Sequence, residues 1–148
     1  MAKIVSLTAL EAASSGFTHK VTVNAADIAA LTSGTAYSLY PAYATSGTKT
    51  NLLVKDVAVY VETAFTYSAG DTGTLVITVG DGSTPNAYVA STTIKTAGWI
   101  KGAQTTNAIP AGNVIKFTPT AATQAITLVN AGEMHIFLQL VDGGDLAK

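Results

Sequence analysis

The chain is organised by short runs in which apolar and polar residues alternate with a period of two. Such alternation is typical of strands that bury one face, because successive side chains of a strand point to opposite sides of a sheet. The longest run, residues 51–65, places Val57, Val59 and Val61 on one face and Tyr60 on the other. Comparable runs predict further strands at residues 17–23, 36–40, 74–79, 86–92, 112–119, 125–129 and 133–141.

Turn-forming residues separate these runs, for example Ser46-Gly47, Ala69-Gly70-Asp71 and Ala131-Gly132. About eight short strands with this punctuation predict an all-β fold, an antiparallel β-sandwich with a jelly-roll-like arrangement. The simplest division of the chain is an N-terminal arm, residues 1–16, followed by a single sandwich domain, residues 17–148.

One segment, residues 24–34, departs from the strand pattern. Asn24 is a candidate N-cap and Asp27 stands three residues after it, as in a capping box, while Gly34 is a candidate C-cap. We therefore expect one short helix near residues 25–31.

Charge is sparse in this chain of 148 residues, since 11% are charged and 48% are hydrophobic. A typical globular domain has about 25% charged residues. No run approaches the roughly 18 apolar residues of a membrane-spanning helix, so no membrane partner is expected. The small, weakly polar residues that fill the surface favour a subunit that other subunits cover, so we expect a homo-oligomer.

The absent residue types exclude several kinds of site. There is no cysteine, so disulfides, thiol nucleophiles and cysteine-based zinc sites are ruled out. There is no arginine and the net charge is −1, which argues against nucleic-acid binding. Ser6, Thr8 and Glu11 interrupt the apolar residues near the N-terminus, so a signal peptide is not expected.

The stretch GDTGTLVITVGDGS, residues 70–83, contains fragments that resemble a protease signature and a calcium loop. The apolar strand follows Asp71-Thr72-Gly73 instead of preceding it, and no second copy exists to complete a protease dyad. A six-residue strand spans about 20 Å, so Asp71 and Asp81 lie too far apart to share an ion. We expect both to be solvent-facing turn residues, and expect Asp71→Asn to leave partner binding nearly unchanged.

The two histidines, His19 and His135, each lie within a strand-like run, and no paired histidine spacing or nucleophile motif accompanies them. They are interpreted as residues of a sheet surface or a subunit contact. The spacing of the carboxylates does not suggest a glycosidase pair. No catalytic residue, metal ligand or cofactor is therefore predicted.

Aromatic residues provide candidate contacts, because tyrosine and tryptophan are enriched at interface hot spots. The candidate subunit-contact residues are Trp99, Tyr60 and Tyr67, together with Ile4 and Leu7 in the arm. A sugar-binding surface is an alternative use for the same aromatic side chains.

Residues 54–91, VKDVAVYVETAFTYSAGDTGTLVITVGDGSTPNAYVAS, resemble a family of small virion proteins of tailed bacteriophages. The shared pattern is a strand from Asp56 to Phe65, a glycine-rich loop, and a strand that ends in Val-Gly-Asp-Gly at Gly82. Residues 21–39, the turn at 109–112 and the closing strand are similar to the same proteins, so the resemblance covers about two-thirds of the chain.

The resemblance implies a capsid decoration, cement or head-fibre protein with a jelly-roll-like fold. Such a protein would be made in the cytoplasm of the bacterial host and bind the major capsid protein on the outer face of the shell, often as a trimer. It carries no catalytic residue, so a non-enzymatic function is expected, with the arm as a candidate tether. A tail, neck or fibre component with a receptor- or glycan-binding surface is the alternative. A protease or glycosidase would require carboxylates that face each other in a cleft.

Overall fold

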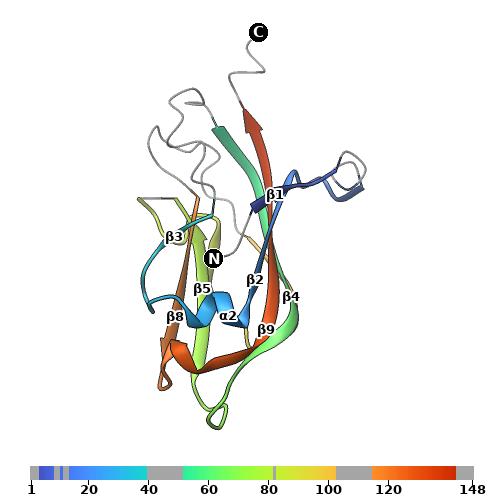
Figure 1. Cartoon of the computed structure of the whole chain (residues 1–148). Helices are drawn as coiled ribbons and strands as arrows, with labels where there is room; N and C mark the ends of the chain where they lie inside the picture. Colours follow the sequence, from blue (N-terminus) through green and yellow to red (C-terminus); the bar gives the residue numbers. More distant parts are fainter. Residues whose placement is uncertain are drawn as a thin grey trace.

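The chain folds into two antiparallel sheets that pack face to face (Figure 1). The structure is a computed structural model that describes residues 4–8, 11, 14–39, 52–81, 83–102 and 115–142. In order, one sheet contains β1 (Ile4–Ser6), β2 (His19–Asn24), β9 (Val129–Asp142), β4 (Leu52–Tyr67) and β7 (Gly98–Lys101). The other contains β3 (Tyr37–Ser38), β8 (Lys116–Ala122), β5 (Thr74–Gly80) and β6 (Val89–Thr93).

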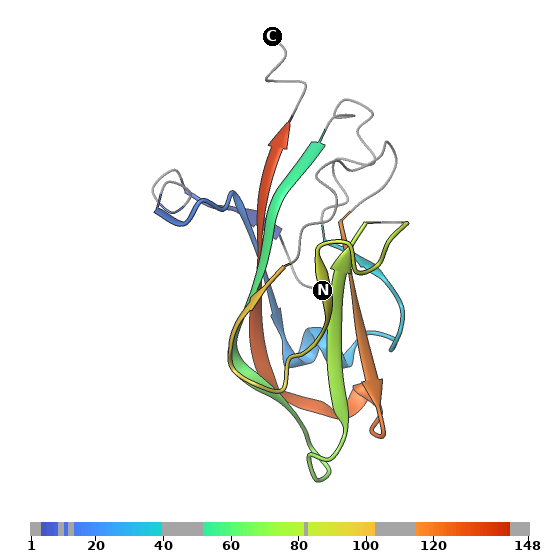
Figure 2. The same cartoon turned by 180° about the vertical axis from the view of Figure 1, so that it is seen from behind.

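The strand order is that of a jelly roll. The adjacent strands β5 and β6 pair, and outward from them β4 pairs with β7, β3 with β8 and β2 with β9. Strands β2 to β5 therefore run antiparallel to strands β6 to β9, as one long hairpin that is rolled into two sheets (Figure 2). The predicted antiparallel sandwich is confirmed.

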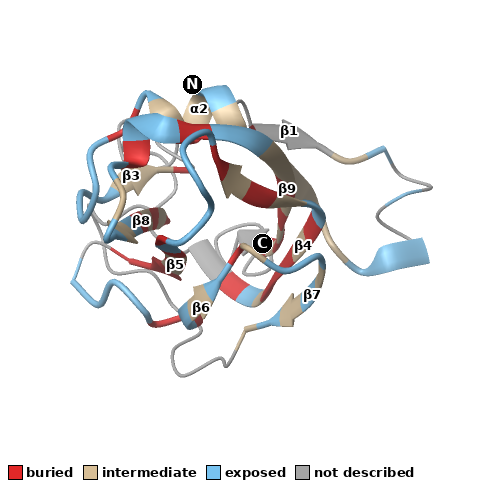
Figure 3. Ribbon diagram, turned by 90° about the horizontal axis from the view of Figure 1, so that it is seen from below, coloured by how far each residue is buried: buried red, intermediate tan, exposed pale blue. Residues whose placement is uncertain are grey.

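The core lies between the sheets, as the end-on view in Figure 3 shows. The alternation predicted for β4 is confirmed, because Val57, Val59 and Val61 are fully buried. From β9 the inward side chains are Met134, Ile136, Leu138 and Leu140. The facing sheet supplies Leu75, Ile77, Val79, Val89 and Phe117.

The short helix α2 spans Ala25–Ala29. Its capping box is present as predicted, because the Asn24 side chain accepts a hydrogen bond from Asp27 N and the Asp27 carboxylate accepts one from Asn24 N. Its C-cap is Ala30, so the prediction of a C-cap at Gly34 is wrong. Gly34 instead has a positive φ of 77° and its N–H donates to the Pro119 carbonyl, which ties the chain after the helix to β8.

One further prediction of local structure is wrong, and two short strands were missed. The apolar run at 125–129 forms a 3-10 turn, η1 (Ile126–Leu128), and not a strand. The two short edge strands β1 and β7 were not predicted. Residues 40, 51 and 112–114 of the predicted strands lie outside the described residues.

Residues 4–6 of the predicted arm contribute to the sheet, since β1 pairs with β2 from Ile4↔Val21 to Ser6↔His19. Among the described residues, no helix has the length and apolar composition needed to cross a membrane.

Candidate functional site

The outer face of the five-stranded sheet carries a cluster of four aromatic residues, which we call the aromatic face: Phe17, Tyr60, Trp99 and Phe137. Tyr60 on β4 pairs directly with Trp99 on β7, and their ring centroids lie 4.8 Å apart. Phe137 on β9 lies 5.7 Å from Trp99 and 5.5 Å from Phe17. Trp99 is 63% exposed, so the cluster ends in a large apolar side chain that faces solvent.

A groove of about 620 Å³ lies on the same face. Three members of the aromatic face line it, and its other lining residues are Ser15, Asp56, Ala58, Lys101 and Gly102. The carboxylate of Asp56 and the ammonium group of Lys101 thus accompany an otherwise mostly apolar surface. An open groove of this composition can bury an apolar or amphipathic surface while hydrogen-bonding polar groups at its margin.

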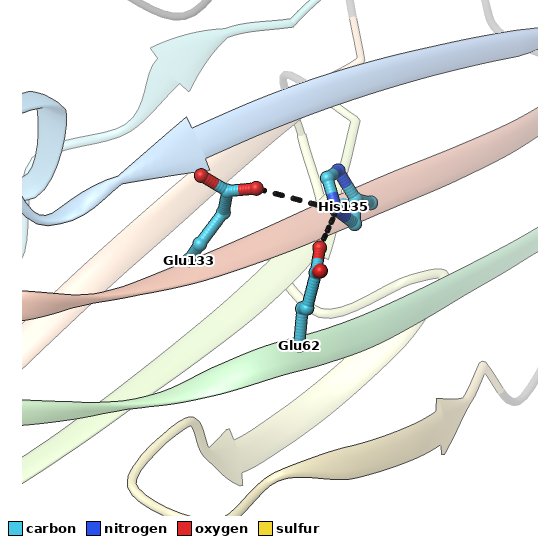
Figure 4. Close-up of side chains that lie close together, drawn as sticks. All are labelled: Glu62, Glu133 and His135. Carbon is cyan, nitrogen blue, oxygen red and sulfur yellow. Dashed lines mark hydrogen bonds and ion pairs between the residues drawn. The ribbon is translucent and has the colours of Figure 1, made fainter.

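A second cluster on this sheet joins Glu62, Glu133 and His135 (Figure 4). His135 Nε2 lies 2.7 Å from Glu62 Oε2 and 3.6 Å from Glu133 Oε1. His135 Nδ1 lies 2.9 Å from the Thr22 hydroxyl on β2. The His135 side chain is 14% exposed, whereas those of Glu62 and Glu133 are 54% and 43% exposed.

Backbone register explains how Glu62 reaches this cluster. Val61 pairs with Met134 and Thr63 pairs with Glu133, so Glu62 is an extra residue on β4, in a β-bulge. Such a bulge changes the direction of a side chain relative to a regular ladder. The cluster was not predicted from the sequence, although Glu133 and His135 are two residues apart in a predicted strand and so share a face.

The cluster also brings two carboxylates together, which is the feature that an enzyme of the glycosidase class would need. The side chains of Glu62 and Glu133 are half-exposed, and neither residue lines the groove. The arrangement therefore lacks the enclosed environment that sets one carboxyl group as acid and the other as base.

Asp71 lies in the turn between β4 and β5 and is exposed, as predicted. Its carboxylate accepts a hydrogen bond from Tyr67 N and forms a 2.8 Å ion pair with Lys95 Nζ. The Lys95 ammonium group also donates to the carbonyls of Asp71 and Gly73. Asp71 therefore holds together the turn between β4 and β5.

The hydrogen bond and charge of Lys95 hold the pKa of Asp71 below its ordinary value of 3.8. Because the folded-state pKa is the lower one, this stabilisation is complete above the unfolded-state pKa and is lost as pH falls through the folded-state pKa. We expect Asp71→Asn to be slightly less stable than wild type at pH 7 in urea denaturation, and the difference to vanish once the pH is below the folded-state pKa of Asp71. A difference that stays constant with pH would contradict this role.

The prediction that Asp81 faces solvent is wrong, since Asp81 is only 6% exposed. Its Oδ1 accepts hydrogen bonds from Ser83 N at 2.7 Å and Thr84 N at 2.6 Å. A short polar side chain can bond the backbone two and three residues ahead, which turns it inward and closes the loop. Burial, and to a lesser extent the Asp81 charge, raises the pKa of the neighbouring Tyr88 to about 12.

The predicted contact residues fall in different environments. Trp99 and Tyr60 lie on the aromatic face, whereas Tyr67 is 4% exposed and donates its hydroxyl to the Thr74 carbonyl. Tyr67 is therefore a core residue and not part of an accessible surface. Ile4 lies in β1, and Leu7 is partly buried beside it, with its N–H donating to the Thr18 carbonyl. Phe17 and Phe137 were not predicted from the sequence to be contact residues.

Comparison with protein-family models, with curated proteins and with solved structures gives no match for this chain.

Proposed function

We propose that this protein is a non-enzymatic structural subunit of a tailed-bacteriophage virion that binds the outer surface of the assembled capsid and stabilises it. The observation that carries the proposal is the aromatic face on the outer side of the five-stranded sheet, where Trp99 is 63% exposed. The resemblance of residues 54–91 to virion proteins of such phages supports the same assignment.

The surface has the chemistry of a docking site. Trp99, Tyr60 and Phe137 form a continuous apolar area, and the Asp56 and Lys101 side chains lie at the groove beside it. Aromatic anchors surrounded by polar groups are the usual composition of an interface hot spot. Rigid strands hold these rings, so little conformational entropy is lost when a partner covers them.

The mechanism is mass action. A subunit that binds the assembled shell and not its free components lowers the free energy of the assembled state. The sandwich would thereby raise the resistance of the shell to heat and low salt without any chemical step. Trimerisation on the shell surface belongs to the same proposal, because a trimer multiplies the effective affinity of a single contact.

Trp99→Ala should weaken binding to shells that were assembled without this protein at least about 30-fold, because truncation of a hot-spot residue costs about 2 kcal/mol or more. Cosedimentation of purified protein with such shells measures the affinity. Leu128→Ala is a matched control, since Leu128 is also an exposed large apolar residue (38%) but lies in η1, away from the aromatic face. Equal binding by wild type and Trp99→Ala, or no binding by wild type, would refute the proposal.

A tail, neck or fibre component that binds a glycan is the alternative, and the groove favours it. Sugars stack on exposed aromatic rings and hydrogen-bond to nearby polar groups, and the groove offers Trp99 together with Asp56 and Lys101. A glycan array would then show binding by wild type that Trp99→Ala or Tyr60→Ala abolishes, with the oligomer size unchanged in light scattering.

A further inference from the structure

We propose that Glu62, Glu133 and His135 form a binding site for a divalent transition-metal ion of the Zn²⁺ class. One ligand atom from each residue lies within 4.8 Å of the other two. The three side chains point toward a common point above β4 and β9 (Figure 4). This site is independent of the proposed capsid binding and can be tested on the purified protein alone.

The spacing of the ligand atoms suits a tetrahedral ion. Bonds of about 2.0–2.2 Å to nitrogen and oxygen place tetrahedral ligand atoms roughly 3.4 Å apart. His135 Nε2 and Glu133 Oε1 are already 3.6 Å apart. Glu62 Oε2, which lies 2.7 Å from Nε2, must move outward by less than about 1 Å, which its half-exposed side chain allows.

The histidine is oriented as a metal ligand usually is. His135 Nδ1 contacts the Thr22 hydroxyl at 2.9 Å, so Nδ1–H can donate to that oxygen and leave the Nε2 lone pair for an ion. β4 supplies Glu62, and β9 supplies Glu133 and His135. These two strands are neighbours in one sheet, which fixes the backbone positions of the three ligands relative to one another. The His135 side chain is largely buried, so few other rotamers are open to it.

The ligand set selects the kind of ion. One imidazole and two carboxylates suit Zn²⁺ and similar transition metals, whereas Ca²⁺ takes six to eight oxygen ligands and Mg²⁺ prefers near-octahedral oxygen coordination. The exposed carboxylates leave a fourth position open to water. The bridging ion would replace the direct hydrogen bond between His135 and Glu62.

Isothermal titration of untagged protein with Zn²⁺ at pH 7.5 should give one site per chain. At a Zn²⁺ concentration about 100-fold above the dissociation constant, the melting temperature should rise by roughly 5–10 °C. Neither Mg²⁺ nor Ca²⁺ at the same concentration should reproduce the shift. No binding at about 100 μM Zn²⁺ would overturn the proposal.

Variants locate the site. His135→Gln should abolish one-site binding, and Glu62→Gln should weaken it at least tenfold while leaving the fold intact, because the Glu62 side chain is exposed. Thr22→Val should weaken binding about 10- to 100-fold, the usual effect of losing a partner that orients a ligand. His19→Gln, which changes the other histidine, is the matched control. Unchanged binding by both His135→Gln and Glu62→Gln, or its loss in His19→Gln alone, would place the ion elsewhere and refute the site.

Discussion

Gly132→Ala should destabilise the protein by about 3–5 kcal/mol, enough to unfold a large fraction of a domain of ordinary stability at 37 °C. Gly132 has a φ of +131°, a conformation that disfavours any side chain. A Cβ at this position would also lie 2.4 Å from Phe65 Cγ and 2.7 Å from Phe65 Cα. Urea denaturation followed by far-UV circular dichroism measures the loss.

The register of β4 and β9 explains this close approach. Thr63 pairs with Glu133 and Thr66 pairs with Ala131, so Ala64 and Phe65 on β4 lie opposite Gly132 alone. The bulge brings the fully buried Phe65 ring over the glycine. Only a residue without a side chain leaves room for that ring.

Gly98→Ala separates backbone strain from the steric clash. Gly98 has nearly the same φ, +134°, but a Cβ added to it would meet no heavy atom within 4 Å. Gly98→Ala should therefore cost only the strain, about 1–3 kcal/mol. Equal losses in the two variants would show that the Phe65 contact contributes nothing.

Asp81→Ala should cost about 2–3 kcal/mol, a larger effect than an exposed turn residue would give. The Ser83 and Thr84 N–H groups both donate to Asp81 Oδ1, and alanine removes that acceptor. The Thr84 carbonyl also accepts a hydrogen bond from Asp81 N, so the side chain and backbone of Asp81 close the same loop between β5 and β6. Thermal unfolding should show a lower melting temperature.

Asp81→Asn is the conservative control, because its amide oxygen can still accept both hydrogen bonds. We expect it to retain most of the stability that Asp81→Ala loses. The pKa of Tyr88 should fall from about 12 when the Asp81 charge is removed, although burial, the larger cause, will still keep it raised. An Asp81→Ala variant as stable as wild type would show that the loop closes without the carboxylate.

The fold could be largely predicted from the alternation of apolar residues, because both sheets have one face in the core. Val57, Val59 and Val61 illustrate this, since alternation places all three on one face and that face is buried. The prediction failed where alternation is short or absent. β7 has four residues and β1 has three, too few for a periodic signal, and each forms because a neighbouring strand offers it unpaired backbone groups.

At residues 125–129 a strand was predicted where the structure has a 3-10 turn. The β-like composition of this run suggested a strand, but η1 turns so that Ile126 and Val129 enter the core while Leu128 stays exposed. Tertiary burial overrides local propensity here, as is common for short segments.

The sequence by itself determined the class of the fold, the capping box of α2 and the absence of any cysteine-based site. Each depends on residues that are near one another in the chain or on composition alone. Only the tertiary structure decided that Trp99 meets Tyr60 and Phe137, that Glu62 reaches His135, and that Asp81 turns inward. The first two of these contacts join separate strands, and their geometry depends on pairing register and bulges, which a strand's own sequence does not specify because the same alternation is compatible with several registers.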